Sequence, residues 1–215
     1  MSARPAVKVS TKDKILNAAE ALFAEHGFEQ TSLRQITAEA DVNLASVNYH
    51  FGSKKALIQA VIARYASVFM PALDAKLTPF EQQTSISSLA IFNCFREPLA
   101  RLNEVRKDGA AIYLSLLGYA YAEIQGHLRK FMLHEYGAVV LKLVTLLHRA
   151  NPQLSDEEIF WRLHFVLGST VFSQVSSQAL QEIAAADFHS QVSAEDIIEK
   201  LIPFIAGGMD APAAS

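Results

Sequence analysis

Apolar residues recur along almost the whole chain at the three- and four-residue spacing that places them on one face of a helix. No segment alternates apolar and polar residues over the length of a strand, and no segment repeats at a fixed period. Hydrophobic residues make up 51% of the 215 positions, which is enough for a sizeable core. The pattern excludes fold classes built on sheets and predicts an all-α protein.

The first part of the chain predicts four helices separated by short breaks. Gly27 ends the first, because glycine accepts the left-handed conformation found just past many helix ends. Asp41–Asn43 form a tight turn, in which Asp41 tolerates that conformation better than most residues do. Gly52 breaks the third helix and Ser53 caps the fourth. The first three expected ranges are 11–27, 31 or 32 to 40, and 44–51. The fourth helix is expected to start at Ser53 and run past Tyr65, with a bend at Pro71.

Longer helices are expected in the remainder of the chain. Ser155 and Glu158 form a capping box that opens one of them, and Ser193 with Asp196 caps the last. The expected ranges are 84–102, 109–121, 122–149, 155–183 and 193–207, followed by a frayed tail over 209–215. No linker of Gly/Ser type occurs, so the fourth helix should rigidly join a small domain, residues 1–65, to a larger one, residues 66–215.

Residues 32–51 combine two short helices with a tight turn, which is the pattern of a helix-turn-helix. The apolar residues placed to fix this crossing, against Leu22 and Phe23 of the first helix, are Leu33, Ile36, Val42, Leu44, Val47 and Phe51. Ala45, Ser46 and Asn48 then face outward. Small and hydrogen-bonding side chains suit the major groove of DNA, where Asn can bond bidentately to adenine and Ala can meet a thymine methyl group. We therefore expect these three residues to read bases.

A helix that reads bases needs phosphate contacts around it. Hydroxyls, helix N-termini, polar tips and positive charges near the third helix are offered by Thr31, Ser32, Arg34, Tyr49, His50, Ser53 and Lys54. The alternative is a plain three-helix bundle whose polar residues are merely solvated. For a single residue such as His50 that alternative is the commoner case, so the whole pattern carries the DNA-binding interpretation.

The distribution of charge agrees in direction with this interpretation. The net charge is −3, which alone would disfavour a nucleic-acid partner. Residues 1–65 nevertheless carry eight Lys/Arg against six Asp/Glu, whereas residues 66–215 carry eleven against sixteen. A mildly basic head on an acidic body suits a small DNA-contacting module attached to a domain with another task.

The stretch Thr31–Leu57 resembles the DNA-binding head of TetR-type repressors, and Ile15–Phe28 is similar to the first helix of that family. The resemblance covers residues 11–65. It implies a TetR-like fold, with a three-helix head and a C-terminal helical domain that binds an effector and dimerises. Val47–Ala60 is similar to a PsrA-like, fatty-acid-responsive subgroup. Asn48 departs from the family pattern, since an aromatic residue commonly stands at its position, so the family's base contacts do not transfer to it.

Helix 155–183 is apolar on more than one side, which requires it to be buried on more than one side. Together with the last helix it would form a four-helix interface between two subunits, as the resemblance to TetR-type proteins also implies. The residues expected at this interface are Phe160, Leu167, Gly168, Val171, Val175, Leu201 and Phe204. The alternative is that they are core of a monomer. A homodimer would present two heads to a pseudo-palindromic operator.

The sequence contains 13 phenylalanines, which could line a long apolar pocket in the larger domain. The residues expected there are Phe92, Phe95, Arg96, Tyr113, Leu116, Leu117, Phe131 and Phe165. An anionic headgroup could pair with any of Arg96, Arg101, Arg129 and His164, which lie near these apolar stripes in the sequence. The alternative is ordinary core. The resemblance implies a long-chain fatty acid or its acyl-CoA ester as the effector, whereas the composition indicates only an apolar ligand.

Several classes of function are disfavoured. Cys94 is the single cysteine, no zinc-like spacing occurs and no catalytic constellation is evident, so we expect no metal, no cofactor and no enzyme. Met1–Ser10 lacks the apolar stretch of a signal peptide, and stretches such as Ala110–Ala122 fall short of a membrane span. A cytoplasmic protein without membrane contact is expected. The remaining alternative to a DNA-binding regulator is a helical protein that binds an apolar ligand or a partner without binding DNA.

Overall fold

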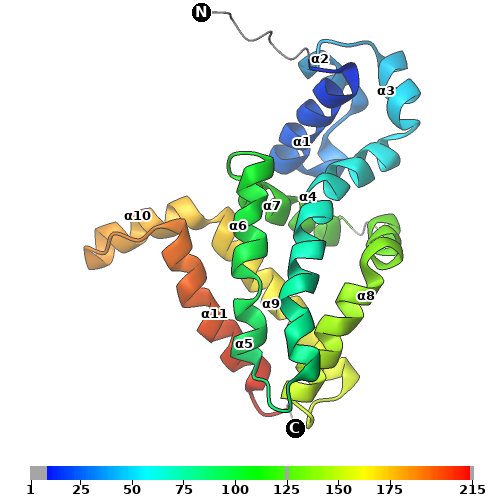
Figure 1. Cartoon of the computed structure of the whole chain (residues 1–215). Coiled ribbons are helices and arrows are strands. Elements are labelled where there is room, and N and C mark those ends of the chain that lie inside the picture. The colour runs from blue at the N-terminus through cyan, green and yellow to red at the C-terminus, as the bar shows by residue number, and fades with distance from the viewer. Residues whose placement is uncertain (1–8, 124–125, 214–215) are drawn as a thin grey trace, which may run out of the picture.

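The computed structural model describes residues 9–123 and 126–213. Within these ranges the chain forms helices and no strand, so the all-α prediction is confirmed (Figure 1). A small head of short helices stands at one end of the molecule, and a larger body of longer helices extends from it. One helix, α4 (Lys54–Leu77), runs from the head into the body and belongs to both.

The head consists of α1 (Thr11–Gln30), α2 (Leu33–Glu39), α3 (Leu44–Phe51) and the start of α4. Each of these helices begins at a side chain that accepts a backbone N–H of its first turn, and the caps are Ser10, Ser32, Asn43 and Ser53. The fully buried apolar residues that join the four helices are Ile15, Phe23, Ile36, Val47 and Leu57. The predicted helix-turn-helix is therefore present, and its turn places Asp41 at φ 52°.

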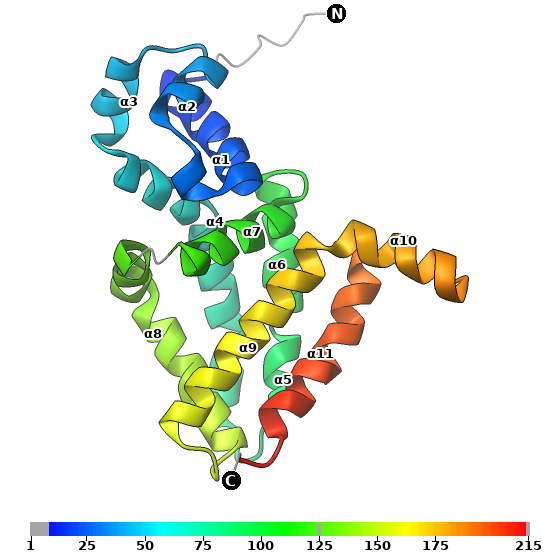
Figure 2. The same cartoon turned by 180° about the vertical axis from the view of Figure 1, so that it is seen from behind.

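The body contains a 3-10 turn, η1, and seven further helices among the described residues. Their bounds are η1 Thr78–Gln82, α5 Ser88–Asn93, α6 Arg96–Val105, α7 Gly109–Ala122, α8 Gly126–Ala150, α9 Asp156–Val175, α10 Ser177–Phe188 and α11 Ala194–Asp210. Seen from behind, α9 and α11 lie side by side, α7 crosses beneath the head, and α10 projects away from the body (Figure 2). The buried apolar side chains of head and body form one continuous cluster.

Two of the expected long helices are divided, so their predicted ranges are wrong. The segment expected as one helix over 84–102 contains α5 and α6, which Cys94 and Phe95 separate. The segment 155–183 is divided at Ser176 into α9 and α10. Serine competes with the helical backbone for hydrogen bonds, which explains why the helix ends at the consecutive serines Ser176 and Ser177.

Two smaller expectations also need correction. α4 continues through Pro71 to Leu77 as one helix. The expected fraying from Met209 onward is wrong for the described part of the tail, because the buried Arg162 guanidinium donates to the carbonyls of Met209 (2.8 Å) and Pro212 (2.9 Å). The bond to Met209 satisfies a carbonyl that the end of α11 leaves without a helical partner, and the bond to Pro212 holds a residue that follows the helix. Residues 214–215 lie outside the described residues.

The prediction that all apolar stretches are too short to span a membrane is also wrong. Lys54–Gln82 and Gly126–Ala150 are long and apolar enough to cross a bilayer, by length and composition alone. The first of them supplies many buried side chains to the core, including Val61, Tyr65 and Leu73. A helix buried on several sides by neighbouring helices has the same composition as a membrane span, so the apolar character of α4 follows from its place in this fold.

Candidate functional site

Helix α3 presents one face to solvent and anchors the other. Val47 is fully buried and Phe51 packs against the same cluster. Ala45 and Asn48 are exposed, and Tyr49 is 85% exposed. No side-chain hydrogen bond joins Asn48 to any other described residue, so its amide can form both bonds of a bidentate contact to adenine.

Asn43 fixes the start of α3. Its Oδ1 accepts the backbone N–H of Ser46 (2.9 Å) and the Ser46 hydroxyl (3.0 Å). The Ser46 hydroxyl proton is therefore held within the first turn, which leaves mainly the lone pairs of its oxygen for a base. The prediction that Leu44 is structural is wrong, because this side chain is 44% exposed beside the same turn.

Several predicted phosphate donors surround α3. Ser32 forms a capping box with Gln35 at the start of α2, and the Ser53 oxygen accepts the N–H of Ala56 (3.2 Å) at the start of α4. Arg34 is exposed and Lys54 is half-buried. Among the described residues neither cation forms an ion pair within the chain, so both charges are available to phosphates.

Thr31 has a different task from the predicted one. Its side chain is fully buried, and its hydroxyl donates to the carbonyls of Gly27 (2.8 Å) and Leu22 (3.1 Å). The helix cap is the next residue, Ser32. The prediction of Thr31 as a phosphate contact is therefore wrong: the hydroxyl bonds to the kink near the end of α1, where Gly27 leaves the helical conformation at φ 83°.

The body encloses a cavity of about 220 Å³ whose walls come from α4 to α9 and α11. The walls are mostly apolar, with Phe69 on α4, Leu143 on α8 and Ile202 on α11 among them. Of the residues expected at a pocket, the cavity is lined by Phe92, Phe95, Arg96, Tyr113 and Leu117.

Three residues expected at the pocket lie elsewhere, so these predictions are wrong. Leu116 is fully buried in the core without lining the cavity. Phe131 is half-buried on α8. Phe165 is 65% exposed on the outer side of α9. The helical period shows which apolar residues share one face of a helix. Helix α9 has apolar faces on two sides, and only one of them lines the cavity, so the period alone could not place Phe165.

Polar groups at the cavity are few. Thr170 donates its hydroxyl to the carbonyl of Val166 (2.8 Å), one turn earlier in α9. Arg96 forms an ion pair with Glu199 of α11. Gln174 is 92% buried, and its side-chain amide nitrogen has no hydrogen-bond partner among the described residues. An unpaired buried donor destabilises a protein by about 1–3 kcal/mol, so Gln174 is an unusual feature of this site.

The outer side of α9 and α11 carries large apolar side chains in contact with solvent. Residues 161, 165, 168, 172 and 175 of α9 follow the alternating four- and three-residue spacing of a helix seam, and Trp161, Phe165, Phe172 and Val175 are 51–65% exposed. Of the residues expected at a dimer interface, Phe160, Gly168, Val175 and Phe204 lie on the exposed side. On this seam Gly168 leaves room for the close approach of another helix.

The remaining three residues expected at the interface face inward. Leu167 and Leu201 line the cavity. Val171 packs against α7, where a Cβ atom added to Gly118 would lie 3.0 Å from Val171 Cγ1. In this subunit these three half-buried side chains contribute to the interior, and their place at a dimer interface stays a prediction.

A buried carboxylate connects the head to the body. Glu20 of α1 is fully buried, and its oxygens bind Arg64 of α4 (2.7 Å) and Arg106 (2.5 Å) at the end of α6. Arg106 stands in a turn that requires Gly109, since a Cβ there would lie 2.7 Å from the Leu102 carbonyl carbon. Arg106 and Glu20 belong to body and head, so this ion pair fixes their relative position.

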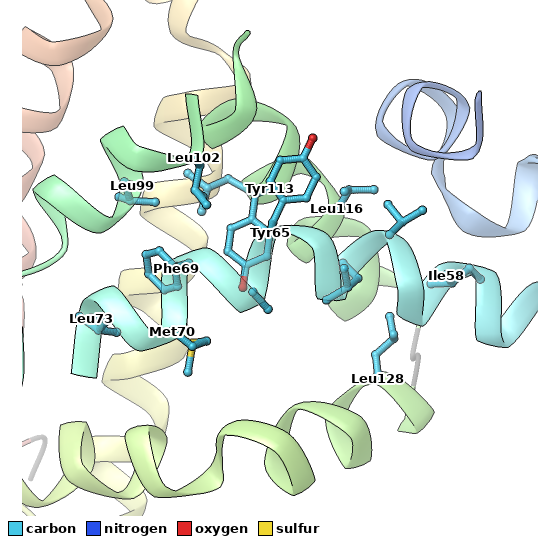
Figure 3. Close-up of a cluster of buried hydrophobic side chains, with 14 of the residues drawn as sticks. Ile58, Tyr65, Phe69, Met70, Leu73, Leu99, Leu102, Tyr113, Leu116 and Leu128 are labelled. Carbon is cyan, nitrogen blue, oxygen red and sulfur yellow. The ribbon is translucent and has the colours of Figure 1, made fainter. Parts of the chain in front are cut away.

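Two stacked tyrosines lie between the Glu20 carboxylate and the cavity. Tyr65 of α4 and Tyr113 of α7 are buried, with ring centroids 5.8 Å apart (Figure 3). The Tyr65 hydroxyl is near enough to Glu20 that burial first, and then the negative charge of Glu20, raise the pKa of Tyr65, although the two groups are not aligned for a hydrogen bond. Burial likewise raises the pKa of Tyr113, which lines the cavity.

A second contact between head and body lies at the end of α7. The Tyr119 hydroxyl donates to the carbonyl of Glu25 (3.3 Å), and Glu123 accepts the backbone N–H of Glu29 (2.9 Å). Gly27 allows this contact, because a Cβ atom at its position would lie 2.8 Å from Tyr119 Cδ1. Helix α7 therefore contacts both the cavity and the last turn of α1.

Family models match both parts of the chain. Residues 15–61 match the family described as bacterial regulatory proteins, tetR family. Residues 93–208, more than half of the chain, match the tetracyclin repressor-like C-terminal domain. The chain belongs to the TetR family. The description of these families as regulators agrees with the prediction that this TetR-family protein is not an enzyme.

Curated relatives are similar mainly over part of their length. The probable HTH-type transcriptional regulator YttP of Bacillus subtilis is 35% identical over 83 residues, which are 39% of this chain and 40% of the relative. The HTH-type transcriptional repressor ComR of Escherichia coli is 33% identical over 94 residues, 41% of this chain and 44% of the relative. The match thus spans less than half of either regulator.

Solved structures show the same TetR-like fold over most of the chain. A mutant of HlyIIR aligns with a TM-score of 0.57 at 20% identity and covers 91% of this chain and 96% of its own. A putative fatty acid metabolism regulator of Clostridium perfringens aligns with a TM-score of 0.51 at 16% identity and covers 91% and 97%. At these identities the likeness concerns the fold alone.

Sequence reasoning missed Glu20 and Arg106, which connect the head to the body, and Gln174 at the cavity. Glu20 and Arg106 are 86 positions apart, and a charged residue within a helical stripe is usually solvated. One signal was available for Glu20, since it follows Ala18 and Ala19 directly on the first helix. Gln174 gave no comparable signal, because a polar residue near the end of an amphipathic helix is ordinary.

Proposed function

We propose that this protein is a DNA-binding transcription regulator, a repressor, whose operator affinity is controlled by an apolar small molecule bound in the body. The observation that carries the proposal is the outward face of α3, where Ala45, Asn48 and Tyr49 are exposed on a helix anchored by the buried Val47. Ala45 and Asn48 read bases in the major groove, with Ser46 beside them. Arg34 and Lys54 bind phosphates, and Ser32, Tyr49, His50 and Ser53 add polar groups at the same surface.

The working unit in this proposal is a homodimer. The exposed seam of α9, centred on Phe165, Gly168 and Phe172, meets the same seam of a second subunit, and Phe204 of α11 adds to it. Exposed large apolar side chains in such number mark an interaction surface rather than an ordinary solvated face. Two heads related by a two-fold axis read a pseudo-palindromic operator. The protein acts in the cytoplasm, where it meets DNA.

The effector in this proposal is an acyl compound, either a long-chain fatty acid or its acyl-CoA ester. Its support is the resemblance of Val47–Ala60 to a fatty-acid-responsive subgroup and the apolar walls of the 220 Å³ cavity. A long chain requires the cavity to widen, since about 30 Å³ accommodates one water-sized group and the present space holds only about seven.

The effector acts through α4 and α7, which line the cavity and contact the head. Binding displaces Tyr113, which is stacked on Tyr65 beside the Glu20 carboxylate. A change in this contact alters the position of the head relative to the body and thereby the spacing of two heads in a dimer. The effector shifts the equilibrium only by the difference between its affinities for the two arrangements.

A titration of labelled upstream DNA with the full-length protein tests the proposal. We expect binding that weakens as salt rises, that is lost with a pair of variants, Arg34→Ala and Lys54→Ala, and that decreases when an acyl ligand is added. Salt-dependent DNA binding that no acyl compound changes would contradict the effector part. Binding of an acyl compound without any DNA binding would instead support a ligand-binding protein that has no regulatory DNA contact.

A further inference from the structure

The polar groups at the cavity differ in whether they are already paired within the protein. The Thr170 hydroxyl donates to the Val166 carbonyl, and the Arg96 guanidinium is paired with the Glu199 carboxylate. Arg96 and Glu199 are both about half exposed, so this pair lies at the solvent side of the wall. Neither group offers an unpaired donor to a ligand inside the cavity.

Gln174 is different. It lines the cavity from the last turn of α9, is 92% buried, and its amide nitrogen lacks a hydrogen-bond partner among the described residues. Buried polar groups in native proteins are paired almost without exception, so an unpaired and nine-tenths buried donor at the wall of an apolar cavity indicates a missing acceptor. Ligand sites commonly combine apolar walls with one or two such polar groups, which fix the orientation of the ligand.

We infer that Gln174 donates a hydrogen bond from its side-chain amide to a neutral carbonyl oxygen of the ligand, and that the effector is an ester or thioester of an acyl chain rather than a free carboxylate. This inference rests on the proposed function and narrows its effector. Arg96 is the only cation among the residues that line the cavity and is already paired with Glu199, and burying an unpaired carboxylate is far more costly than burying a neutral carbonyl. A carboxylate at Arg96 would have to compete with Glu199 for the same guanidinium.

Calorimetric titration of the full-length protein tests this inference with three probes of similar chain length. The probes are methyl octanoate, sodium octanoate and 1-octanol, which share an eight-carbon chain and each exceed by only a few non-hydrogen atoms the roughly seven groups that the cavity holds. We expect the ester to bind at least tenfold more tightly than octanoate. The alcohol, whose oxygen accepts a hydrogen bond less strongly than a carbonyl oxygen does, should bind more weakly than the ester.

The variant Gln174→Leu removes the donor and preserves much of the volume. We expect it to weaken binding of methyl octanoate about tenfold and to leave the melting temperature of the ligand-free protein unchanged or higher, because an unpaired buried donor is lost. Thr170→Val is the matched control on the same wall, and it should leave the ratio of ester to octanoate unchanged. A merely structural Gln174 would lower the melting temperature and weaken all three probes equally.

Two outcomes would overturn the inference. One is that Gln174→Leu binds methyl octanoate as tightly as the unchanged protein does. The other is that octanoate binds more tightly than the ester and that Arg96→Gln abolishes this binding. Failure of the proposed function gives a different result, since methyl octanoate would then bind through Gln174 without changing the affinity for DNA.

Discussion

Substitution of Arg106 by alanine should separate the contribution of the head–body ion pair from the stability of each part. Arg106 lies in the turn between α6 and α7 and binds the fully buried Glu20 of α1 at 2.5 Å. The substitution leaves Glu20 paired with Arg64 at 2.7 Å, so the carboxylate does not become an isolated buried charge. The variant therefore weakens one connection without the larger loss of 3–5 kcal/mol, roughly, that an orphaned buried ion causes.

The expected loss follows from the exposure of the two partners. Hydrogen bonds to charged groups contribute about 1.5–3 kcal/mol. The Arg106 side chain is 43% exposed, so solvent screens part of this contribution and about 1–2 kcal/mol remains. For a protein of this size such a loss lowers the melting temperature by about 2–8 °C.

Thermal unfolding of the full-length protein at one fixed concentration measures this loss. Fixed concentration matters because the stability of a dimer depends on it. Arg101→Ala is the matched control, since Arg101 is an exposed arginine on α6, the helix that ends directly before Arg106, and forms no ion pair among the described residues. A double-mutant cycle with Glu20→Gln then isolates the pair, and we expect a coupling energy of about 1 kcal/mol.

The operator titration completes the test, because Arg106→Ala should also reduce the change in DNA affinity that the effector causes. The reasoning is refuted if Arg106→Ala and Arg101→Ala lower the melting temperature equally and the double-mutant cycle gives no coupling. If Arg106→Ala lowers the stability but leaves the effector response unchanged, the Glu20–Arg106 pair stabilises the fold and does not transmit the effect of the ligand.

Four further outcomes are expected. Asn48→Ala should reduce the preference for operator over random DNA by about 1–3 kcal/mol in a competition assay, and an unchanged preference would contradict its contact with a base. Lys54→Ala should weaken binding to all sequences and reduce the slope of log affinity against log salt by about one. Phe165→Asp should convert the dimer to a monomer in analytical ultracentrifugation, while a retained dimer would place the interface elsewhere. Thr31→Val should lower the free energy of unfolding by about 1–3 kcal/mol through the carbonyls it leaves unpaired and leave the salt slope unchanged, and a lower slope would restore Thr31 as a phosphate contact.

Local chemistry explains why the head could be predicted closely. Gly27 and Asp41 adopt positive φ, and Ser32 and Ser53 cap helices, where the sequence pattern placed a break, a turn and two helix starts. These features depend on a few neighbouring residues. Thr31 shows the limit, because its hydroxyl could cap a helix or bond backward to Gly27, and the choice depends on packing around the break.

The body was harder to predict because its helices are apolar on several sides. On α9 the sequence could not distinguish Leu167, which lines the cavity, from Phe165, which faces solvent two residues earlier. The division at Ser176 also depends on where α10 finds contacts, and α10 has no buried residue in this subunit. Non-local contacts of this kind are decided by the packing of whole helices.

The same connections that were hardest to predict determine how a ligand in the body could affect the head. Tyr113 is part of the cavity wall and is stacked on Tyr65, whose hydroxyl lies beside Glu20. Glu20 binds one arginine on α4 and one at the end of α6, so a displacement of Tyr113 changes a site where three helices meet. Packed interiors resist continuous deformation, and a small displacement there favours one of a few discrete arrangements. The coupling free energy is consequently bounded by what these contacts contribute, about 1–3 kcal/mol, which corresponds to a 5- to 150-fold change in operator affinity.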